Sequence, residues 1–431
     1  MNIVAVIAEY NPFHNGHKFH IEESKRLSGA NNMIAVMSGN FVQRGEPAIF
    51  DKLTRATAAV KGGIDAVFEL PVRYSTSSSP DFAYAGVEII NSLGGITHLS
   101  FGTETPDVDK LQSISDIILK ETSSFKSSLN DHLKEGYSFP KARALALEEE
   151  IGSDDAAILS SPNNILAIEY LTALKKMNSE IIPIAIPRRG ASHDSAIETN
   201  PVIYPEMNSY TNADNNINPC VYGYTNIDTN MSMNSNIVSA KSIRELLHDN
   251  LDVEAEKYIP FSDIFNGKAK LSIKDFEVLI NKRLLDLQSK YEDILDLDKD
   301  LYNKIKKLSL PMNCDEIITA LKSKEITYSR ICRVLIHILL EIDNAKKNTG
   351  IYCPYTTLLA LNKNNSGLLK TINNTDKIKI INKRADYIPE NKFAEDLYLL
   401  DKKATDLYNL IYYSKTGIKS PKELSSNVSI I

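Results

Sequence analysis

Short apolar runs alternate with segments of helical period over the first hundred residues of the chain. The apolar runs are rich in β-branched residues, as in strands buried on both faces, and the helical segments end close to glycines, which commonly terminate helices. This alternation is typical of βαβ units, so we predict a doubly wound α/β domain around a parallel sheet. The predicted strands are residues 3–8, 33–37, 66–69 and 98–101, and the predicted helices lie near residues 18–27, 52–61 and 81–93.

The pattern changes further along the chain. Residues 108–150 follow a helical period, and a further amphipathic helix begins at Pro162. The apolar run 181–186 then predicts another strand, which places Arg188 and Arg189 at its carboxyl end. Ligands of α/β sheets usually bind at that end of the strands.

A stretch of low complexity and a second, helical part complete the chain. Residues 196–236 are crowded with Asn, Ser, Thr and Tyr without periodicity, which indicates an inserted loop. A serine-capped helix is predicted to begin at Ser239, and the chain after residue 250 is mostly helical. The predicted domains are residues 1–250 and residues 251–431, the second mainly helical and capped by strand-like runs at 355–361 and 377–381.

Composition agrees with this organisation and narrows the class of protein. The 431 residues exceed the roughly 100–200 residues of one domain, and 43% hydrophobic with 24% charged residues are typical of globular proteins. The formal charge of −6 gives no overall sign of a polyanionic partner. Four widely spaced cysteines indicate neither a zinc site nor disulfides. Without a signal peptide or a long apolar stretch, we expect a cytoplasmic protein that does not contact membranes.

The turn His14-Asn15-Gly16-His17 joins the first predicted strand to the first predicted helix. Gly16 lets the backbone approach a ligand closely, and the N-terminus of the helix presents free N–H groups to an anion. Two imidazoles there can stabilise charge that develops at an α-phosphate. The turn therefore predicts ATP binding and adenylate formation, with His14 and His17 as catalytic residues. Taken alone, the four residues are weak evidence, and two histidines that only satisfy a turn are then the favoured interpretation.

Other residues with anion-binding chemistry follow other predicted elements. The segment from Ser239 to Arg244 resembles the I-S-S-T-x-I-R element of nucleotidyltransferases, whose arginine holds the β- and γ-phosphates. Gly102 ends a strand where adenine or ribose can lie against the backbone. Arg44 and Arg188 offer guanidinium groups at the same edge of the sheet. A plain capped helix, a simple turn and solvated arginines are the structural alternatives.

Longer strings carry a more specific resemblance. Residues 7–17 (IAEYNPFHNGH) and 37–48 (MSGNFVQRGEPA) resemble the bacterial tRNA(Met) cytidine acetate ligase family, within the H-x-G-H nucleotidyltransferase superfamily, almost throughout. The resemblance implies a Rossmann-like nucleotidyltransferase domain followed by a mainly helical C-terminal domain. Shorter similar strings are residues 68–71, 100–102, 161–166 and 187–190, and the helical part resembles the family more loosely, chiefly at 326–333.

The resemblance implies an enzyme that activates acetate with ATP and releases pyrophosphate. The acetyl group would pass from acetyl-adenylate to N4 of the wobble cytidine of elongator tRNA(Met), giving N4-acetylcytidine. Mg²⁺ would accompany the triphosphate, but no acidic cluster identifies its ligands. The tRNA is expected to contact Arg330 and Arg333 in the helical part, against the alternative of a packed amphipathic helix. The sequence gives no indication of an oligomeric state.

The resemblance also assigns residues of the site. His14 and His17 would stabilise the α-phosphate, while Ser239 and Arg244 would hold the departing pyrophosphate. Further ATP contacts fall at Gly102, Asn163 and Arg188, with Asn164 as the alternative to Asn163. The ATP-binding stretch corresponds to Ile7, Ala8, Glu9, Tyr10, Asn11, Pro12, Phe13, His14, Asn15, Gly16, His17, Lys18, Phe19 and His20.

Two features depart from the family and two other functions remain open. The Asn-rich insert is longer than expected, and Lys241 stands where the phosphate element has threonine. One alternative is another adenylyltransferase of the superfamily that acts on a small phosphorylated substrate, although such enzymes are usually much shorter. The other is a non-catalytic RNA-binding protein with an ATP-shaped cleft, against which the intact pair of histidines argues.

Overall fold

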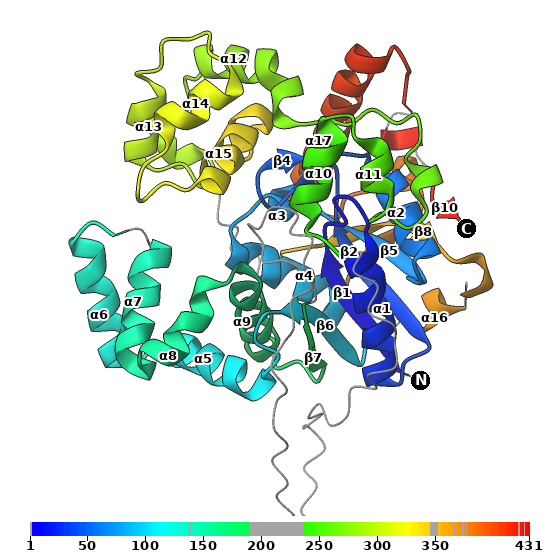
Figure 1. Cartoon of the computed structure of the whole chain (residues 1–431), viewed down its shortest axis with the longest axis horizontal. Helices are drawn as coiled ribbons and strands as arrows, with labels where there is room; N and C mark the ends of the chain where they lie inside the picture. Colours follow the sequence, from blue (N-terminus) through cyan, green and yellow to red (C-terminus); the bar gives the residue numbers. More distant parts are fainter. Residues whose placement is uncertain are drawn as a thin grey trace, which may run out of the picture.

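The structure, a computed structural model, is built around one sheet with helices on both faces (Figure 1). It describes residues 2–137, 139–188, 237–344, 352–365, 367–372, 375, 377–420, 423–425 and 427–431. Among these residues the sheet has eight strands, seven of them in the order β10-β8-β5-β2-β1-β6-β7, with β9 paired to β8. They are β1 Ile3–Ala8, β2 Asn32–Ser38, β5 Ala66–Leu70, β6 His98–Thr103, β7 Ile182–Pro187, β8 Tyr355–Leu361, β9 Lys379–Ile381 and β10 Ser429–Ile430.

The predicted parallel sheet is confirmed. β1 pairs in parallel with both β2 and β6, and the parallel pairing continues from β2 to β5 and from β6 to β7. These strands are mostly buried, as expected for a parallel sheet covered on both faces. β8 runs antiparallel to β5. The five parallel strands therefore present their carboxyl ends at one edge, with β1 in the middle.

Two hydrophobic layers cover the sheet because alternate strand residues face opposite sides. Ile3 and Ala5 of β1 belong to a core shared with helices α4, α5 and α9. Val4 and Val6 belong to a second core, shared with α1, α2 and α10. The bounds of these helices are α1 Asn15–Ser28, α2 Lys52–Lys61, α4 Ser79–Leu93, α5 Val108–Lys120, α9 Pro162–Lys176 and α10 Ala240–His248.

Two helical lobes extend from the sheet on the left of Figure 1. The α5–α8 lobe consists of α5 and three further helices, and the α12–α15 lobe has a hydrophobic core of its own. That core also includes Phe41 and Tyr408, which come from outside the lobe. The remaining helices are α3 Val72–Ser75, α6 Ser123–Lys134, α7 Phe139–Ile151, α8 Ser153–Ala156, α11 Asp252–Glu256, α12 Glu277–Leu285, α13 Lys299–Ile305, α14 Cys314–Leu321, α15 Tyr328–Leu340, α16 Leu368–Ile372 and α17 Lys392–Thr416.

The last part of the chain returns to the sheet. The runs predicted at 355–361 and 377–381 do form strands, β8 and β9, but they extend the central sheet instead of capping the helical part, which corrects that prediction. β8 has a neighbouring strand on each side. All of its residues are buried, as is usual for a strand inside a covered sheet. Residues on both sides of position 250 thus share one sheet, and the two-domain division stays a prediction.

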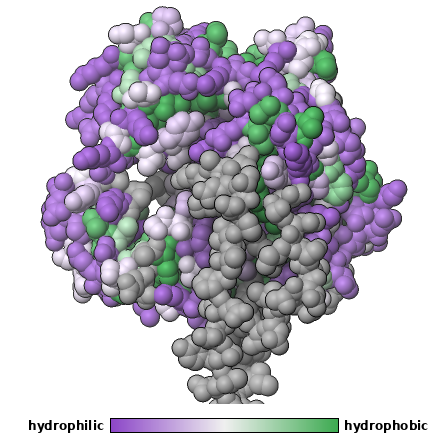
Figure 2. Space-filling model, viewed as in Figure 1, coloured by the Kyte–Doolittle hydropathy of each residue, from purple (hydrophilic) through white to green (hydrophobic). Residues whose placement is uncertain are grey.

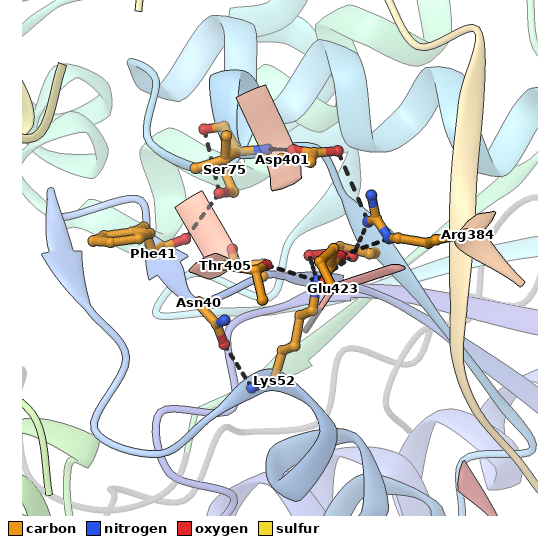
Figure 3. A network of polar contacts seen from close by, with 12 residues as sticks. Asn40, Phe41, Lys52, Ser75, Arg384, Asp401, Thr405 and Glu423 are labelled. Atoms are coloured by element: carbon orange, nitrogen blue, oxygen red, sulfur yellow. Dashed lines mark hydrogen bonds and ion pairs between the residues drawn. The ribbon is translucent and has the colours of Figure 1, made fainter. Parts of the chain in front are cut away.

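A buried network of charged side chains ties this returning segment to the sheet (Figure 3). The Lys52 ammonium group lies 2.8 and 3.0 Å from the two carboxylate oxygens of Glu69 and 2.6 Å from Glu423 Oε1. Arg384 contacts Glu69 and Glu423, each at 2.6 Å. All four side chains are buried, so each charge depends on its partners for compensation.

The surface and the cysteines concern two further predictions, that the chain does not contact membranes and that its cysteines form neither a zinc site nor disulfides. Figure 2 shows mainly hydrophilic residues on one face, with hydrophobic residues in small separate patches. Within the described ranges, no helix combines the length and the apolar character that crossing a bilayer requires. Cys314, Cys332 and Cys353 are buried and free. Cys220 and the predicted loop 196–236 lie outside the described residues.

Candidate active site

The H-x-G-H turn lies at the carboxyl end of β1, where the strand order reverses. β2 and β5 follow on one side of β1, and β6 and β7 lie on the other. The chain leaves β1 through Tyr10, whose φ of 47° is left-handed, and enters α1 at its N-cap residue His14. Such a switch point at the carboxyl edge is where α/β sheets usually bind ligands. The ATP-binding stretch predicted at residues 7–20 spans the end of β1, this turn and the first part of α1.

Two hydrogen bonds define which ring nitrogen of each histidine carries a proton. His14 Nδ1 accepts from the backbone N–H of Gly16 at 3.0 Å, and His17 Nδ1 accepts from the backbone N–H of His14 at 3.2 Å. A nitrogen that accepts a hydrogen bond carries no proton, so each neutral ring is protonated on Nε2. The ring centroids lie 3.8 Å apart. The turn therefore carries two neighbouring Nε2–H donors.

Burial keeps both rings neutral. It lowers the pKa of His14 to about 3, and the positive charges of Arg188 and Arg244 act in the same direction. Burial also lowers the pKa of His17 well below its usual range, reinforced by His14, His20 and Arg188. A neutral imidazole with a fixed Nε2–H can stabilise an anion without giving up its proton near neutral pH. The pair therefore suits electrostatic stabilisation of a phosphate.

His14 is expected to stay neutral and protonated on Nε2 from about pH 8 to about pH 5, where an ordinary histidine becomes charged. Because folding lowers this pKa, its contribution to stability is complete above about pH 6.5 and declines as acid is added. Ring ¹⁵N shifts of histidine-labelled protein measure both tautomer and charge. His132, whose pKa is raised by hydrogen bonds with Glu149 and Glu135, is the internal control that should titrate. Titration of His14 near pH 6.5 would contradict the assignment.

Gly16 has no side chain, which allows the segment leading into α10 to pack against the turn. A Cβ at this position would lie 2.8 Å from His14 Cε1 and 3.3 Å from Ile237 Cγ2, so the turn has no room for a side chain. Ile237 leads directly into α10. The start of α10 therefore lies beside the histidines, as a phosphate-binding role requires.

Ser239 and Arg244 occupy the first two turns of this helix. Ser239 is the predicted N-cap, and its Oγ accepts from the backbone N–H of Ser242 at 3.1 Å. Arg244 donates to the carbonyl oxygen of Asn11 at 2.8 Å, which fixes its guanidinium group next to the H-x-G-H turn. The structure thus brings both predicted phosphate residues to the edge of the site.

A second group of predicted contacts lies at the ends of β6 and β7. Arg188 donates from Nη1 to Asn163 Oδ1 at 3.0 Å, and its Nε lies 3.8 Å from Glu104 Oε1. Gly102 is adjacent, since a Cβ there would lie 3.5 Å from Arg188 Cγ. Because Arg188 also lowers the pKa of His14, these side chains belong to the same site as the histidines.

Asn164 has a different environment from Asn163. Its buried Oδ1 accepts from the backbone N–H groups of Glu104 and Thr105, both at 3.0 Å, and its Nδ2 donates to the Ile158 carbonyl at 3.1 Å. These bonds hold the loop after β6 in place. Asn163 is only partly buried and contacts Arg188, so the geometry favours Asn163 over Asn164 as the nucleotide contact.

Separate substitutions of Asn163 and Asn164 are expected to change different quantities, ATP binding for Asn163 and the free energy of unfolding for Asn164. Asn164→Ala should lower the free energy of unfolding by about 1–3 kcal/mol, because it leaves the partly buried N–H groups of Glu104 and Thr105 without an acceptor. Asn163→Ala should leave that free energy nearly unchanged and weaken ATP binding. Urea unfolding and calorimetric ATP titration measure the two quantities. The opposite pattern would assign the nucleotide contact to Asn164.

Arg55 is a residue of the site that the sequence reasoning missed. Its fully buried guanidinium group donates to the carbonyl oxygens of Glu9, Ser38, Gly39 and Phe50. It therefore joins the carboxyl ends of β1 and β2 and holds the chain just before the H-x-G-H turn. The available signal was an arginine one turn before Ala58 and Ala59, on the face of the predicted helix 52–61 that packs against the sheet.

His20 is tied into a chain of hydroxyl groups. Ser24 donates to the His20 carbonyl at 2.6 Å, so its oxygen must accept from Ser100, at 2.6 Å. Ser100 in turn accepts from His20 Nε2–H at 3.0 Å. The Nε2–H donor of His20 is thus used inside the protein, whereas those of His14 and His17 have no acceptor among the residues that the structure describes.

No metal site is identified by the side chains of the described ranges. No group of three or more His, Cys, Asp and Glu side chains among those residues is placed to hold an ion. The Mg²⁺ expected with the triphosphate therefore stays a prediction, with no ligands assigned.

Comparison with known proteins places this site in a family. The model of the HIGH Nucleotidyl Transferase family matches residues 1–204 and 210–422. The tRNA(Met) cytidine acetate ligase of Caldanaerobacter subterraneus subsp. tengcongensis is 36% identical over 425 residues, which cover 96% of each chain. That of Clostridium acetobutylicum is 36% identical over 431 residues, or 95% of this chain and 96% of its own. The chain belongs to the tRNA(Met) cytidine acetate ligase family.

Solved structures agree with this assignment over the full length. A crystal structure of Thermotoga maritima TmcAL bound with alpha-thio ATP matches with a TM-score of 0.83 at 25% identity. The apo form of the same protein matches with a TM-score of 0.84 at 26% identity, and each match covers 100% of both chains. The nucleotidyltransferase fold predicted from the sequence is therefore confirmed.

Lys241, one of the two departures from the tRNA(Met) cytidine acetate ligase family pattern, leaves the local structure of the phosphate element intact. Its ammonium group lies 4.0 Å from Glu245 Oε1, one turn along α10. The cap at Ser239 and the contact of Arg244 with Asn11 are both formed despite the replacement. The other departure, the Asn-rich insert, lies outside the described residues.

Arg330 and Arg333, the predicted tRNA contacts of this family member, form ion pairs within the α12–α15 lobe. Arg330 Nη2 lies 2.6 Å from Asp298 Oδ2, and Arg333 Nε lies 2.8 Å from Asp296 Oδ2. Both arginines are partly exposed on α15. The ion pairs alone account for their placement, so contact with tRNA stays a prediction.

Proposed function

We propose that this chain is an ATP-dependent acetate ligase that acetylates N4 of the wobble cytidine in elongator tRNA(Met). The proposal rests on family membership together with one structural observation. That observation is the pair of neutral Nε2–H donors at the N-terminus of α1, with Arg188 and Arg244 close enough to affect them. Such a site can stabilise negative charge on a phosphate at which a carboxylate reacts.

The proposed reaction has two steps. A carboxylate oxygen of acetate attacks the α-phosphorus of ATP, the bond to the β-phosphate oxygen breaks, and pyrophosphate leaves. The N4 amino group of cytidine then attacks the acetyl carbonyl of acetyl-adenylate, loses a proton and releases AMP. The products are N4-acetylcytidine, AMP and pyrophosphate.

The residues of the site divide the work of the first step. His14 and His17 donate to the α-phosphate as charge accumulates there, and their low pKa keeps these donors fixed. Ser239 and Arg244, with the N-terminus of α10, hold the departing pyrophosphate. Asn163 and Arg188 contact the nucleotide. Positioning and electrostatics supply the rate enhancement, since no side chain forms a covalent bond.

We infer the acceptor from the names of the relatives. Those relatives are named for tRNA(Met) as substrate. The α12–α15 lobe is the part we assign to tRNA, with Arg330 and Arg333 as candidate phosphate contacts after exchange of their aspartate partners. The reaction would take place in the cytoplasm, where tRNA is modified.

ATP–pyrophosphate exchange with a panel of carboxylates tests the activation step and separates the alternatives. Exchange that depends on acetate, and far less on longer or branched acids, supports the ligase. Exchange that depends instead on a phosphorylated small molecule supports another adenylyltransferase of the superfamily. Binding of ATP or tRNA without any exchange supports the non-catalytic RNA-binding protein.

A further inference from the structure

The hairpin formed by β3 Phe41–Val42 and β4 Glu46–Pro47 carries Arg44 near its tip. The backbone N–H of Gly45 donates to the Val42 carbonyl at 2.9 Å, and Gly45 has a φ of 76°, so the turn closes through a left-handed glycine. Its two flanks contact different parts of the molecule, one the candidate active site and the other the α12–α15 lobe.

On one flank the hairpin is attached to the end of β1. The backbone N–H of Gln43 donates to Glu9 Oε1 at 2.9 Å, and Glu9 directly follows β1. Burial lowers the pKa of both Arg188 and Arg244, and the positive charge of Arg44, next in the chain, acts in the same direction. The carboxylates of Glu104 near Arg188 and of Glu46 and Glu9 near Arg244 act against it. Arg44 is thus close enough to both other guanidinium groups to repel them, and an anion bound among them would stabilise this arrangement.

On the other flank the hairpin rests on the backbone of α15. A Cβ on Gly45 would lie 2.1 Å from the backbone N of Arg333 and 2.4 Å from the carbonyl carbon of Cys332. Burial, and after it the neighbouring Cys332 and Glu46, raise the pKa of the hydroxyl group of Tyr328, the first residue of α15, so Glu46 also lies close to that helix. The hairpin therefore packs directly against the backbone of α15 at Gly45.

The base of the hairpin is held as well, so its tip is positioned by Glu9 on one side and by α15 on the other. The Phe41 carbonyl accepts from Ser75 Oγ at 2.8 Å, and Asn40 Oδ1 accepts from the backbone N–H of Lys52 at 2.8 Å (Figure 3). The Phe41 ring packs at 5.7 Å from Phe276 in the α12–α15 lobe. Both the base and the tip thus contact that lobe.

We propose that Arg44 binds an anionic oxygen of the substrates in the active site and that α15 positions it through Gly45. The inference deepens the proposed function and rests on it for the identity of the substrates, whose anionic groups are the triphosphate and the carboxylate. A ligand that moves α15 would then change the anion site, which couples the α12–α15 lobe to activation.

Four full-length variants test the proposal: Arg44→Ala, Gly45→Ala, Tyr328→Phe and Gly417→Ala. Gly417 is the matched control, since its φ of 71° imposes similar strain on alanine but nothing lies within 4 Å of its added Cβ. Calorimetry measures binding of ATP and of pyrophosphate, and saturation-transfer NMR measures binding of acetate. Exchange kinetics supply KM for each substrate and kcat.

Arg44→Ala is expected to weaken binding of one of the three anions about 10- to 100-fold, as loss of a charge-assisted hydrogen bond does. Weaker binding of ATP and pyrophosphate would show that Arg44 contacts a phosphate group. Weaker binding of acetate alone would show that it contacts the carboxylate. Added guanidinium ion should restore part of the binding in Arg44→Ala. Gly45→Ala should weaken binding of the same anion, and added guanidinium ion should not restore it. Gly417→Ala should bind all three anions as the unsubstituted protein does.

Unchanged binding of all three anions in Arg44→Ala would overturn the proposal, and so would a Gly45→Ala variant that behaves like Gly417→Ala. If Gly45→Ala does not fold, the milder Tyr328→Phe decides, and unchanged binding there removes α15 from the positioning role. Absence of acetate-dependent exchange in the unsubstituted protein contradicts the proposed function instead. The binding measurements then still decide whether Arg44 holds an anion.

Discussion

The His17→Ala variant is expected to lose ATP–pyrophosphate exchange by a factor on the order of 10²–10³, the usual effect of removing a donor aimed at developing charge. His17 Nδ1 is held by the backbone N–H of His14, so its Nε2–H is fixed before substrate binds. Alanine removes this donor and cannot replace it with water in the same orientation. Exchange rates at saturating acetate and ATP measure the loss in kcat.

Two further variants separate catalysis from folding at this position. His17→Asn keeps an acceptor for the His14 N–H group but has no donor at the reach of Nε2, so it should be nearly as inactive as His17→Ala. His132→Ala removes a histidine of α6 in the α5–α8 lobe and should retain full exchange. All variants should still bind tRNA. Exchange by His17→Ala within about tenfold of the unsubstituted rate would remove His17 from the mechanism.

The Glu69→Gln variant is expected to lower the free energy of unfolding by about 3–5 kcal/mol, the cost of leaving buried charges without their partner. Glutamine keeps the size of the side chain but removes one of the two carboxylates that Lys52 and Arg384 both contact, so Glu423 is left to face two buried positive charges. Both cations are buried, so water cannot compensate them. Urea unfolding followed by circular dichroism measures the change.

Glu23→Gln is the matched control for this effect. Glu23 also pairs with an arginine, Arg26, whose side chain is 60% exposed, so its loss should cost at most about 1 kcal/mol. The contrast between the two substitutions isolates the effect of burial. Equal unfolding midpoints for Glu69→Gln and Glu23→Gln would show that the network in Figure 3 contributes little to stability.

Much of the fold was predictable because its strands carry a local signal. β1, β2, β5, β6 and β7 are short apolar runs that end near glycines or polar turns, and each was predicted within a few residues. β8 was found as a strand, but its place in the sheet depends on pairing with β5 almost three hundred residues earlier. Periodicity reports burial along one segment and carries no information on such distant partners.

The candidate site likewise contains residues that local sequence patterns predicted and residues that they could not predict. The H-x-G-H turn, the cap at Ser239 and the strand end at Arg188 were predicted because each is a local pattern at the end of a predicted element. The choice between Asn163 and Asn164 was not, since adjacent helix residues differ in burial only once the helix has packed. Arg55 and the Glu69 network were missed because a buried charge is recognised only through partners distant in sequence.

Incubation of the purified protein with ATP, labelled acetate and an unmodified elongator tRNA(Met) transcript tests the central claim most directly. We expect label to appear as N4-acetylcytidine at the wobble position, with release of AMP and pyrophosphate, and only when both ATP and acetate are present. A transcript with uridine at that position should stay unlabelled. Absence of label in the cytidine transcript, or labelling of the uridine transcript, would contradict the account.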